Sequence, residues 1–254
     1  PNGQRLYLDG THPESSIPLC VNPYQAVLYT RAGYKRVDQL RKRHQEERGR
    51  KFTLFRNNVA FARYEFSQES PRHQWDRVTF AFHENYTVTR RIPEKELIRK
   101  VAPFLILRIP IIGAGKIGSD NQREPEARYQ ISQRADFLLS LAPSHTTENR
   151  PIYNTRDVPY ANRFSWRRIH VISGDSNMLE LPEYLKFGLT MILLSMIEDG
   201  CLDDRFEIYD PISAMHRVSR DTNICERVWL HNRRNSRAII DCLKEYVDVF
   251  QTYV

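Results

Sequence analysis

The stretch LPEYLKFGLTMILLSMIEDG, residues 181–200, constrains the fold of this chain more than any other feature. Its body is almost wholly apolar, Pro182 lies near its start and Gly200 follows its end, which is the pattern of a complete helix. A helix that is apolar on most of its sides needs cover on most of its sides. We therefore expect this helix to be buried, packed behind a sheet.

The strand patterns indicate what that sheet contains. Residues 5–10 alternate Leu6 and Leu8 with polar side chains, which predicts a strand with one face on a core. Residues 77–90 and 166–175 also read as strands, and 127–141 and 150–157 as strands or strand-loop units. We expect further helices at 24–48, ending at Gly49, at 93–108 and at 236–250, a short strand at 51–55 and a surface loop at 63–77.

This order of elements predicts the fold class. Strands alternate with helices, and the strands carry charged faces, so an α+β fold fits better than a parallel, doubly wound sheet. Helices would back one face of a largely antiparallel sheet. The other face would be open and would hold the chemistry.

Composition limits the class of protein. With 254 residues, 41% of them hydrophobic, the chain can bury one large core. A net charge of +7 favours acidic partners such as nucleotides or an acidic polypeptide, but the excess is too modest to single out nucleic acid. The four cysteines lack CxxC spacing, and neither a signal peptide nor a membrane span is indicated. We expect a cytoplasmic protein that binds neither nucleic acid nor membrane.

The segment GAGKIG, residues 113–118, matches the GxGxxG pattern of dinucleotide-binding sites. That site needs a strand before the glycines and a helix after them, so that the helix N-terminus receives the pyrophosphate. Here the preceding run contains Pro103 and Pro110 and the following residues are polar. We interpret the segment as a glycine-rich turn.

Polar strand faces are the better candidates for a site. Tyr7 and Asp9 share one face of their strand, and Arg168 and His170 share one face of theirs. His83 and Glu84 would need a bulge or a strand end to reach one site. Each cluster alone is typical of a solvated face, but three such strands together suggest phosphoryl transfer to a carboxylate or a related ATP-driven ligation. Ligands for Mg²⁺ bound to nucleotide phosphates would come from Tyr7, Asp9, Glu14, Glu84 and His170, and positive charge for the phosphates from Arg134, Arg156, Arg167 or Arg168.

Several of these segments, in this order, resemble one family. The motifs are NGQRLYLDGTHPE, FRNN, FHENY, PFLILRIPIIGAGKI, ISQRAD, RPIYNTRD and RRIHVISGDSNM followed by LKFGLT, and they cover nearly the whole chain. They resemble the family of Pup ligase and Pup deamidase/depupylase. The resemblance implies a fold similar to glutamine synthetase, with a curved antiparallel sheet that binds ATP and Mg²⁺ and helices behind it.

The resemblance also implies a reaction. The family's ligase phosphorylates the C-terminal glutamate of the small protein Pup with ATP, and a substrate lysine attacks the γ-glutamyl phosphate to form an isopeptide bond. Asp9 matches the catalytic aspartate that takes the lysine proton, and Tyr7 and Glu14 match neighbouring positions in the nucleotide and metal cradle. The implied set also includes metal ligands His83, Glu84 and His170 and nucleotide-binding Arg134, Arg156, Arg167 and Arg168.

The sequence is compatible with three functions. GAGKI, GDSNM and Cys20 look more like the ligase branch, whereas the spacing from Asp9 to Glu14 is nearer the depupylase. We expect the family's first strand, with a metal-binding GxExE(F/Y)G motif, and most of its C-terminal Pup-binding domain to be missing from residues 1–254. We expect residues 1–254 to form one catalytic-type domain whose sheet is incomplete at the N-terminus. Ligation is favoured over depupylation or deamidation, and a non-catalytic nucleotide-binding relative is the third possibility.

Overall fold

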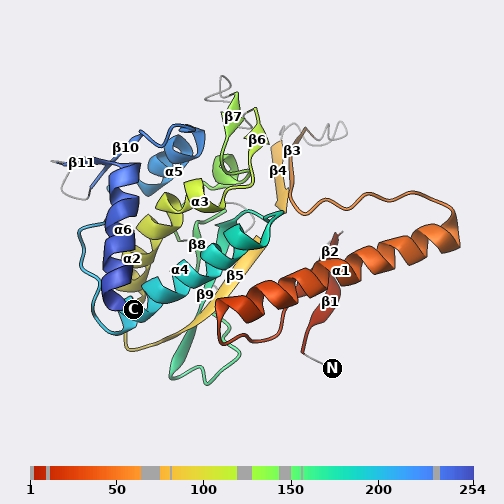
Figure 1. Ribbon diagram of the computed structural model, residues 1–254, viewed down its shortest axis with the longest axis horizontal. Coiled ribbons are helices and arrows are strands. Elements are labelled where there is room, and N and C mark those ends of the chain that lie inside the picture. Colours follow the sequence, from red (N-terminus) through yellow and green to blue (C-terminus); the bar gives the residue numbers. More distant parts are fainter. Residues whose placement is uncertain are drawn as a thin grey trace, which may run out of the picture.

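The computed structural model describes residues 3–9, 12–63, 75–80, 82–118, 128–142, 150–155, 157–230 and 235–254. Helices and antiparallel strand pairs make up its structure, so the expected α+β class is confirmed (Figure 1). The helices are α1 Pro23–Arg48, α2 Glu94–Leu107, α3 Ile109–Ile112, α4 Glu180–Glu198, α5 Pro211–Arg220 and α6 Ile239–Tyr253, with a short helical turn at Ala135–Phe137. The strands are β1 Arg5–Asp9, β2 His12–Ser16, β3 Asn58–Arg63, β4 Trp75–Phe80, β5 Phe82–Thr89, β6 Lys116–Ile117, β7 Tyr129–Gln130, β8 Tyr153–Asn154, β9 Trp166–Gly174, β10 Arg227–Trp229 and β11 Ser236–Ala238.

The central sheet has the order β5-β9-β8 and is antiparallel throughout. One of its faces buries Val88, Ile169 and Val171 in the main core, to which α2, α4, α5 and α6 also contribute. On the other face, the alternate residues of β5 from His83 to Thr87 and of β9 from Trp166 to His170 are exposed or half-buried, whereas Ile172 is buried. The sheet thus has a core face and an open face, as the alternation of its strands requires.

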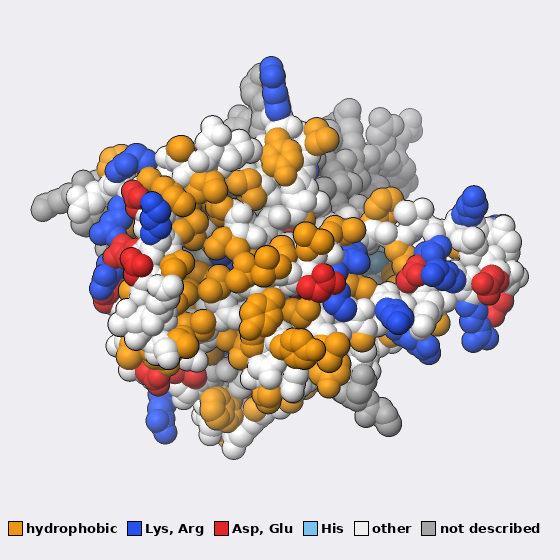
Figure 2. Space-filling model, viewed as in Figure 1, with side chains coloured by type: hydrophobic (Ala, Val, Ile, Leu, Met, Phe, Trp, Pro, Cys, Tyr) orange, Lys and Arg blue, Asp and Glu red, His pale blue; other side chains and the backbone are white. Residues whose placement is uncertain are grey.

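Helix α4 confirms the prediction from the apolar stretch. Leu193 and Ile197 are buried against the sheet, and the helix lies in front of β5 and β9 in Figure 1. Its first turns differ from the expectation, because Leu181 and Tyr184 are exposed. Apolar side chains are abundant on this face of the molecule (Figure 2).

Helix α1 begins and ends as its sequence predicts. The side chain of Asn22 accepts a hydrogen bond from the backbone N–H of Gln25, and Gly49 ends the helix at a φ of 64°. Ala26 is buried, whereas Leu40 in the second half of the helix is exposed. The second half of α1 extends away from the core and is charged on its surface (Figures 1 and 2).

Several other expectations need correction. Leu6 and Leu8 alternate as predicted, but both are exposed, because β1 pairs only with β2 within the described residues. Residues 51–55 are not a strand. The loop expected at 63–77 includes the end of β3 and the start of β4, and its centre, 64–74, lies outside the described residues.

The glycine-rich segment forms a turn that leads into a short strand. Gly113 lies so close to the backbone of Ile131 that a Cβ on it would be 2.3 Å from the carbonyl oxygen of that residue. Lys116 then starts β6, which pairs with β7. A strand in this place is incompatible with a dinucleotide-binding helix, so the turn interpretation is confirmed. None of the helices in the described ranges has the length and apolar composition needed to cross a lipid bilayer.

Candidate active site

The β1–β2 hairpin brings together the polar residues of the N-terminal segment. Tyr7 lies opposite Glu14, and Asp9 lies opposite His12. Directly opposed residues and residues two apart share a face, so all four side chains project from one side. One ligand atom from each of Asp9, His12 and Glu14 lies within 4.8 Å of the others, which is close enough to hold one metal ion.

His12 is the member of this cluster that the sequence reasoning missed. No strand was predicted directly after residue 10, whereas His12–Ser16 forms strand β2. The signal was present, since a glycine directly after an alternating strand suits the first position of a two-residue hairpin loop. A two-residue hairpin would have placed His12 opposite Asp9.

Tyr7 supports the cluster as a hydrogen-bond donor. Partial burial, a hydrogen bond to Glu14 and the negative charges of Glu14 and Asp9 all raise the pKa of its phenol. The hydroxyl therefore stays protonated at neutral pH and can donate to the Glu14 carboxylate. This bond leaves the second oxygen of Glu14 available for a cation.

The open face of the central sheet supplies the second part of the site. His170 Nδ1 lies 2.7 Å from the Asn85 side-chain oxygen, and the rings of His83 and His170 meet edge to face, 5.2 Å apart. The pairing of β5 with β9 shifts between Phe82 and Glu84, but this shift does not bring His83 and Glu84 to one face, and Asn85, on the same face as His83, lies opposite His170. His83 and His170 therefore share one face.

The two parts lie near one another. The ring of His12 packs against Phe80, at the end of β4, with centroids 4.0 Å apart. His83 follows shortly after Phe80 in the chain, and its pKa is influenced by the charge of His12. The hairpin cluster and the start of β5 therefore belong to one region.

The pKa of His83 is lowered from its ordinary value. Desolvation is the first cause, followed by the charges of Arg134, His170 and Arg150, although His83 is exposed to solvent. The imidazole is consequently neutral at pH 7. A neutral imidazole nitrogen can bind a metal, whereas an imidazolium cannot.

Arg134 is the most unusual charge in this region. It is completely buried, and none of its three guanidinium nitrogens has a hydrogen-bond partner among the described residues. Burial and the nearby charge of Arg150 lower its pKa to about 10. Since a buried cation is strongly unfavourable without a partner, an anion is the natural complement of this guanidinium.

The structure does not bring every predicted residue to this region. Glu84 points to the core, where both carboxylate oxygens accept hydrogen bonds from the buried Arg108, at 2.9 and 2.6 Å, and Tyr86 donates to the same carboxylate. Arg167 also lies on the core side and donates to the carbonyl of Ile92. The alternation of β5 and β9 explains both positions, because each residue is one step out of phase with the open face.

The remaining arginines differ from one another. Arg168 lies on the same face of β9 as His170, as predicted. Arg156 lies outside the described residues. The metal role of Glu84 and the nucleotide roles of Arg156, Arg167 and Arg168 stay predictions.

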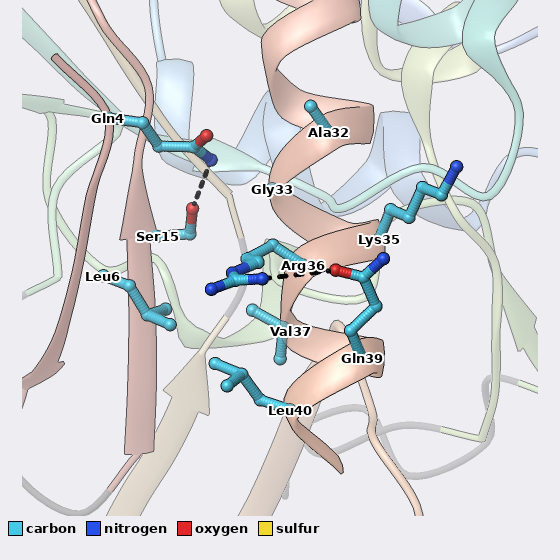
Figure 3. Close-up of a pocket in the computed structure, with 10 residues that line it drawn as sticks. All are labelled: Gln4, Leu6, Ser15, Ala32, Gly33, Lys35, Arg36, Val37, Gln39 and Leu40. Atoms are coloured by element: carbon cyan, nitrogen blue, oxygen red, sulfur yellow. Dashed lines mark hydrogen bonds between the residues drawn. The ribbon is translucent and has the colours of Figure 1, made fainter. Parts of the chain in front are cut away.

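A cavity of about 530 Å³ lies between the β1–β2 hairpin and α1 (Figure 3). Leu6 and Ser15 face it from the hairpin, and Arg36, Val37 and Leu40 from the helix. Leu6 and Ser15 are cross-strand partners, so they project from the face opposite to Tyr7 and Glu14. The cavity is therefore separate from the metal-binding cluster.

The donor set fits a divalent cation next to a polyanion. Two carboxylates and one imidazole can ligate a metal ion, and Mg²⁺ commonly combines a few carboxylates with phosphate oxygens. Arg134 offers the unsatisfied guanidinium that a phosphate group accepts. The described residues thus fit a metal–nucleotide complex.

Comparison with known proteins shows that the chain is similar to Pup ligases and to depupylases. The sequence profile of the family described as Pup-ligase protein matches residues 1–254. A Pup–protein ligase of Corynebacterium diphtheriae is 42% identical over 229 residues, covering 87% of this chain and 43% of the relative. A depupylase of Acidothermus cellulolyticus is 36% identical over 254 residues, covering 100% of this chain and 47% of the relative.

Solved structures agree with these relatives. The Pup ligase PafA of the prokaryotic ubiquitin-like modification pathway, in complex with ADP, matches with a TM-score of 0.81 and 33% identity, over 99% of this chain and 52% of that chain. The crystal structure of the complex between Pup and its ligase PafA matches with a TM-score of 0.82 and 32% identity, over 99% and 48%. The chain spans about half the length of the curated relatives that it matches. With its profile matched from end to end and its fold shared with these structures, the chain belongs to the Pup-ligase family.

Proposed function

We propose that the protein is an ATP- and Mg²⁺-dependent ligase that joins the C-terminal glutamate of a Pup-like small protein to a substrate lysine. The observation that carries this proposal is the position of Asp9, an exposed carboxylate beside His12 and Glu14 in a metal-binding arrangement. Ligation needs a metal–nucleotide complex and a base side by side, and this cluster supplies both. The names of the ligase relatives and the ADP complex of PafA support it.

The reaction has two balanced steps. The glutamate carboxylate attacks the γ-phosphorus of ATP, so that an acyl phosphate forms and ADP leaves. The lysine nitrogen then attacks the acyl carbon, an isopeptide bond forms, and inorganic phosphate leaves. Activation is needed because a free carboxylate is a poor electrophile.

The residues of the chain have distinct roles in this proposal. Glu14 and His12, which lie within ligand distance of Asp9, would help to hold Mg²⁺ together with phosphate oxygens, and the metal roles of His83 and His170 stay predictions. Arg134 would neutralise phosphate oxygens. Asp9 would accept the proton of the lysine ammonium, since only the neutral amine is a nucleophile.

Depupylation is the second candidate, and a specific observation favours it. The depupylase of Acidothermus cellulolyticus aligns with the whole of this chain. In that reaction a carboxylate such as Asp9 would act on an existing isopeptide, and water would replace the lysine. The same cluster is chemically suitable for both directions of amide chemistry.

The test is to incubate the full-length protein with ATP, Mg²⁺, a Pup-like protein ending in glutamate and a lysine-bearing protein. We expect a covalent adduct in mass spectrometry, with one ATP consumed per bond, and the Asp9→Asn variant should form none while still binding ADP. Asp248→Asn, at an exposed position on α6, is the control and should retain activity.

Two outcomes would separate the candidates. Cleavage of a Pup isopeptide without stoichiometric ATP consumption would replace ligation by depupylation. Failure of the intact protein to bind any adenine nucleotide would overturn both.

A further inference from the structure

A buried carboxylate outside the metal-binding cluster organises the surroundings of Arg134. Asp175 directly follows β9 and is almost completely buried. Its Oδ2 accepts hydrogen bonds from the backbone N–H groups of Ala114, at 2.9 Å, and Gln133, at 3.0 Å, and its Oδ1 accepts one from the Ser132 hydroxyl, at 3.3 Å. Three hydrogen bonds to one buried carboxylate hold that side chain and its donors in one arrangement.

These bonds join three separate parts of the chain. Ala114 belongs to the glycine-rich turn, Ser132 and Gln133 to the turn that precedes Arg134, and Asp175 to the end of the central strand β9. The Ser132 oxygen also accepts a hydrogen bond from the backbone N–H of Arg134, at 3.1 Å. Asp175 therefore ties the backbone that carries Arg134 to the sheet.

The negative charge of Asp175 influences the pKa of Arg134, although the two side chains form no hydrogen bond with each other. Asp175 favours the charged form of the guanidinium, against burial and the charge of Arg150. Its oxygens accept hydrogen bonds from two backbone N–H groups and the Ser132 hydroxyl, and the guanidinium nitrogens of Arg134 have no hydrogen-bond partner among the described residues. From the open face of the sheet, His83 is the neighbouring titratable group.

We propose that Asp175 is a positioning residue that keeps Arg134 in place, charged and available for the phosphate groups of an adenine nucleotide. The inference rests on the nucleotide role proposed above for Arg134. It assigns the hydrogen bonds and charge of Asp175 to phosphate recognition rather than to folding alone. The consequence is that Asp175 contributes to the affinity for phosphate but not for the nucleoside.

Asp136 offers a matched comparison on the same segment. It is as deeply buried as Asp175 and lies two residues after Arg134, but its carboxylate is paired with Lys116, at 3.1 Å, and Arg220, at 2.7 Å. A substitution there removes a buried acid without removing the hydrogen bonds to Ala114 and Gln133. It therefore reports what general destabilisation does to binding.

The experiment measures ADP and adenosine binding by calorimetry on the full-length protein and its variants. Asp175→Asn keeps the shape of the side chain and one acceptor oxygen, and circular dichroism checks that it is folded. We expect its ADP affinity to fall about tenfold, while adenosine binding changes less than about twofold. Asp136→Asn should weaken both ligands equally or neither.

A double-mutant cycle with Arg134→Gln tests whether Asp175 acts through Arg134. If it does, adding Asp175→Asn to Arg134→Gln causes no further loss of ADP affinity. Equal losses for ADP and adenosine, additive losses in the cycle, or unchanged ADP affinity in Asp175→Asn would overturn the inference. An unaltered protein that binds no ADP would instead overturn the proposed function, and this inference with it.

Discussion

Glu14 and Glu84 are residues of the same type with different roles in this protein. Glu14 lies on the hairpin face with Asp9 and His12, half-exposed and close enough to share a cation with them. Glu84 is buried and forms a two-pronged ion pair with Arg108, which also donates to Thr190. Removing one partner of such a buried pair is strongly destabilising, so Glu84 holds the sheet against the helices.

His12 supplies a prediction at this scale. Replacing it by alanine removes the imidazole ligand beside Asp9 and should weaken divalent-cation binding by about tenfold, or ~1.4 kcal/mol. Titration with Mn²⁺, followed by electron paramagnetic resonance, measures the change. His44→Ala is the control, because His44 is exposed on α1, where its ring packs on Phe52. Equal cation affinity in His12→Ala would remove His12 from the site.

Helix α4 is the element that combines packing with charge. Its middle buries Lys186, whose ammonium donates to the carbonyl of Asp175, at 2.6 Å, and lies over the ring of Phe82. Lys186 therefore joins α4 to the end of β9, at the residue that also holds the Arg134 turn. Burial lowers its pKa to about 8, and the negative charge of Glu84 opposes that change.

This pKa predicts how stability depends on pH. Between about pH 8 and the ordinary value of 10.5, the unfolded chain keeps the Lys186 proton that the folded chain releases, so the free energy of unfolding rises with pH. Relative to Lys186→Met, the unaltered protein should gain up to about 3 kcal/mol across this range. Urea denaturation from pH 7.5 to 10 measures the difference, and Lys95→Met, exposed on α2, controls for the loss of one lysine. A flat difference would contradict the assignment.

At the scale of the whole molecule, helix α6 packs against the main core. Tyr246 of α6 is buried, stacks on Phe206 with ring centroids 3.9 Å apart and meets Phe104 of α2 edge to face. Its hydroxyl has no hydrogen-bond partner among the described residues. Packing in this place is favourable, whereas the buried hydroxyl is unfavourable.

Two substitutions separate these contributions. Tyr246→Phe removes only the hydroxyl and should raise the free energy of unfolding by about 1 kcal/mol. Tyr246→Ala removes the ring and should lower it by about 3–5 kcal/mol. Thermal and urea unfolding measure both. Tyr253→Phe is the comparison, because that hydroxyl donates to Asp199 and its removal should be neutral or destabilising; destabilisation by Tyr246→Phe would show that its hydroxyl has a partner.

Much of the local structure followed from the sequence. Helical spacing with Gly49, and Pro182 with Gly200, placed the ends of α1 and α4 within two residues, and alternation placed Tyr7 with Asp9 and Arg168 with His170. These features depend on residues a few positions apart, so the periodicity of apolar and polar residues in the sequence is enough to predict them. The ordered motifs also indicated the family, which the comparisons confirmed.

Contacts between distant residues were decided only by the tertiary structure. The pairing of Glu84 with Arg108, the exposure of Leu6 and Leu8 and the isolation of the Arg134 guanidinium each depend on which segments pack together. Alternation tells which side chains share a face, but not whether that face meets a core, a cation or solvent. That difference has a physical cause, because burial and charge pairing are set by the three-dimensional neighbours of a residue and not by its neighbours in the chain.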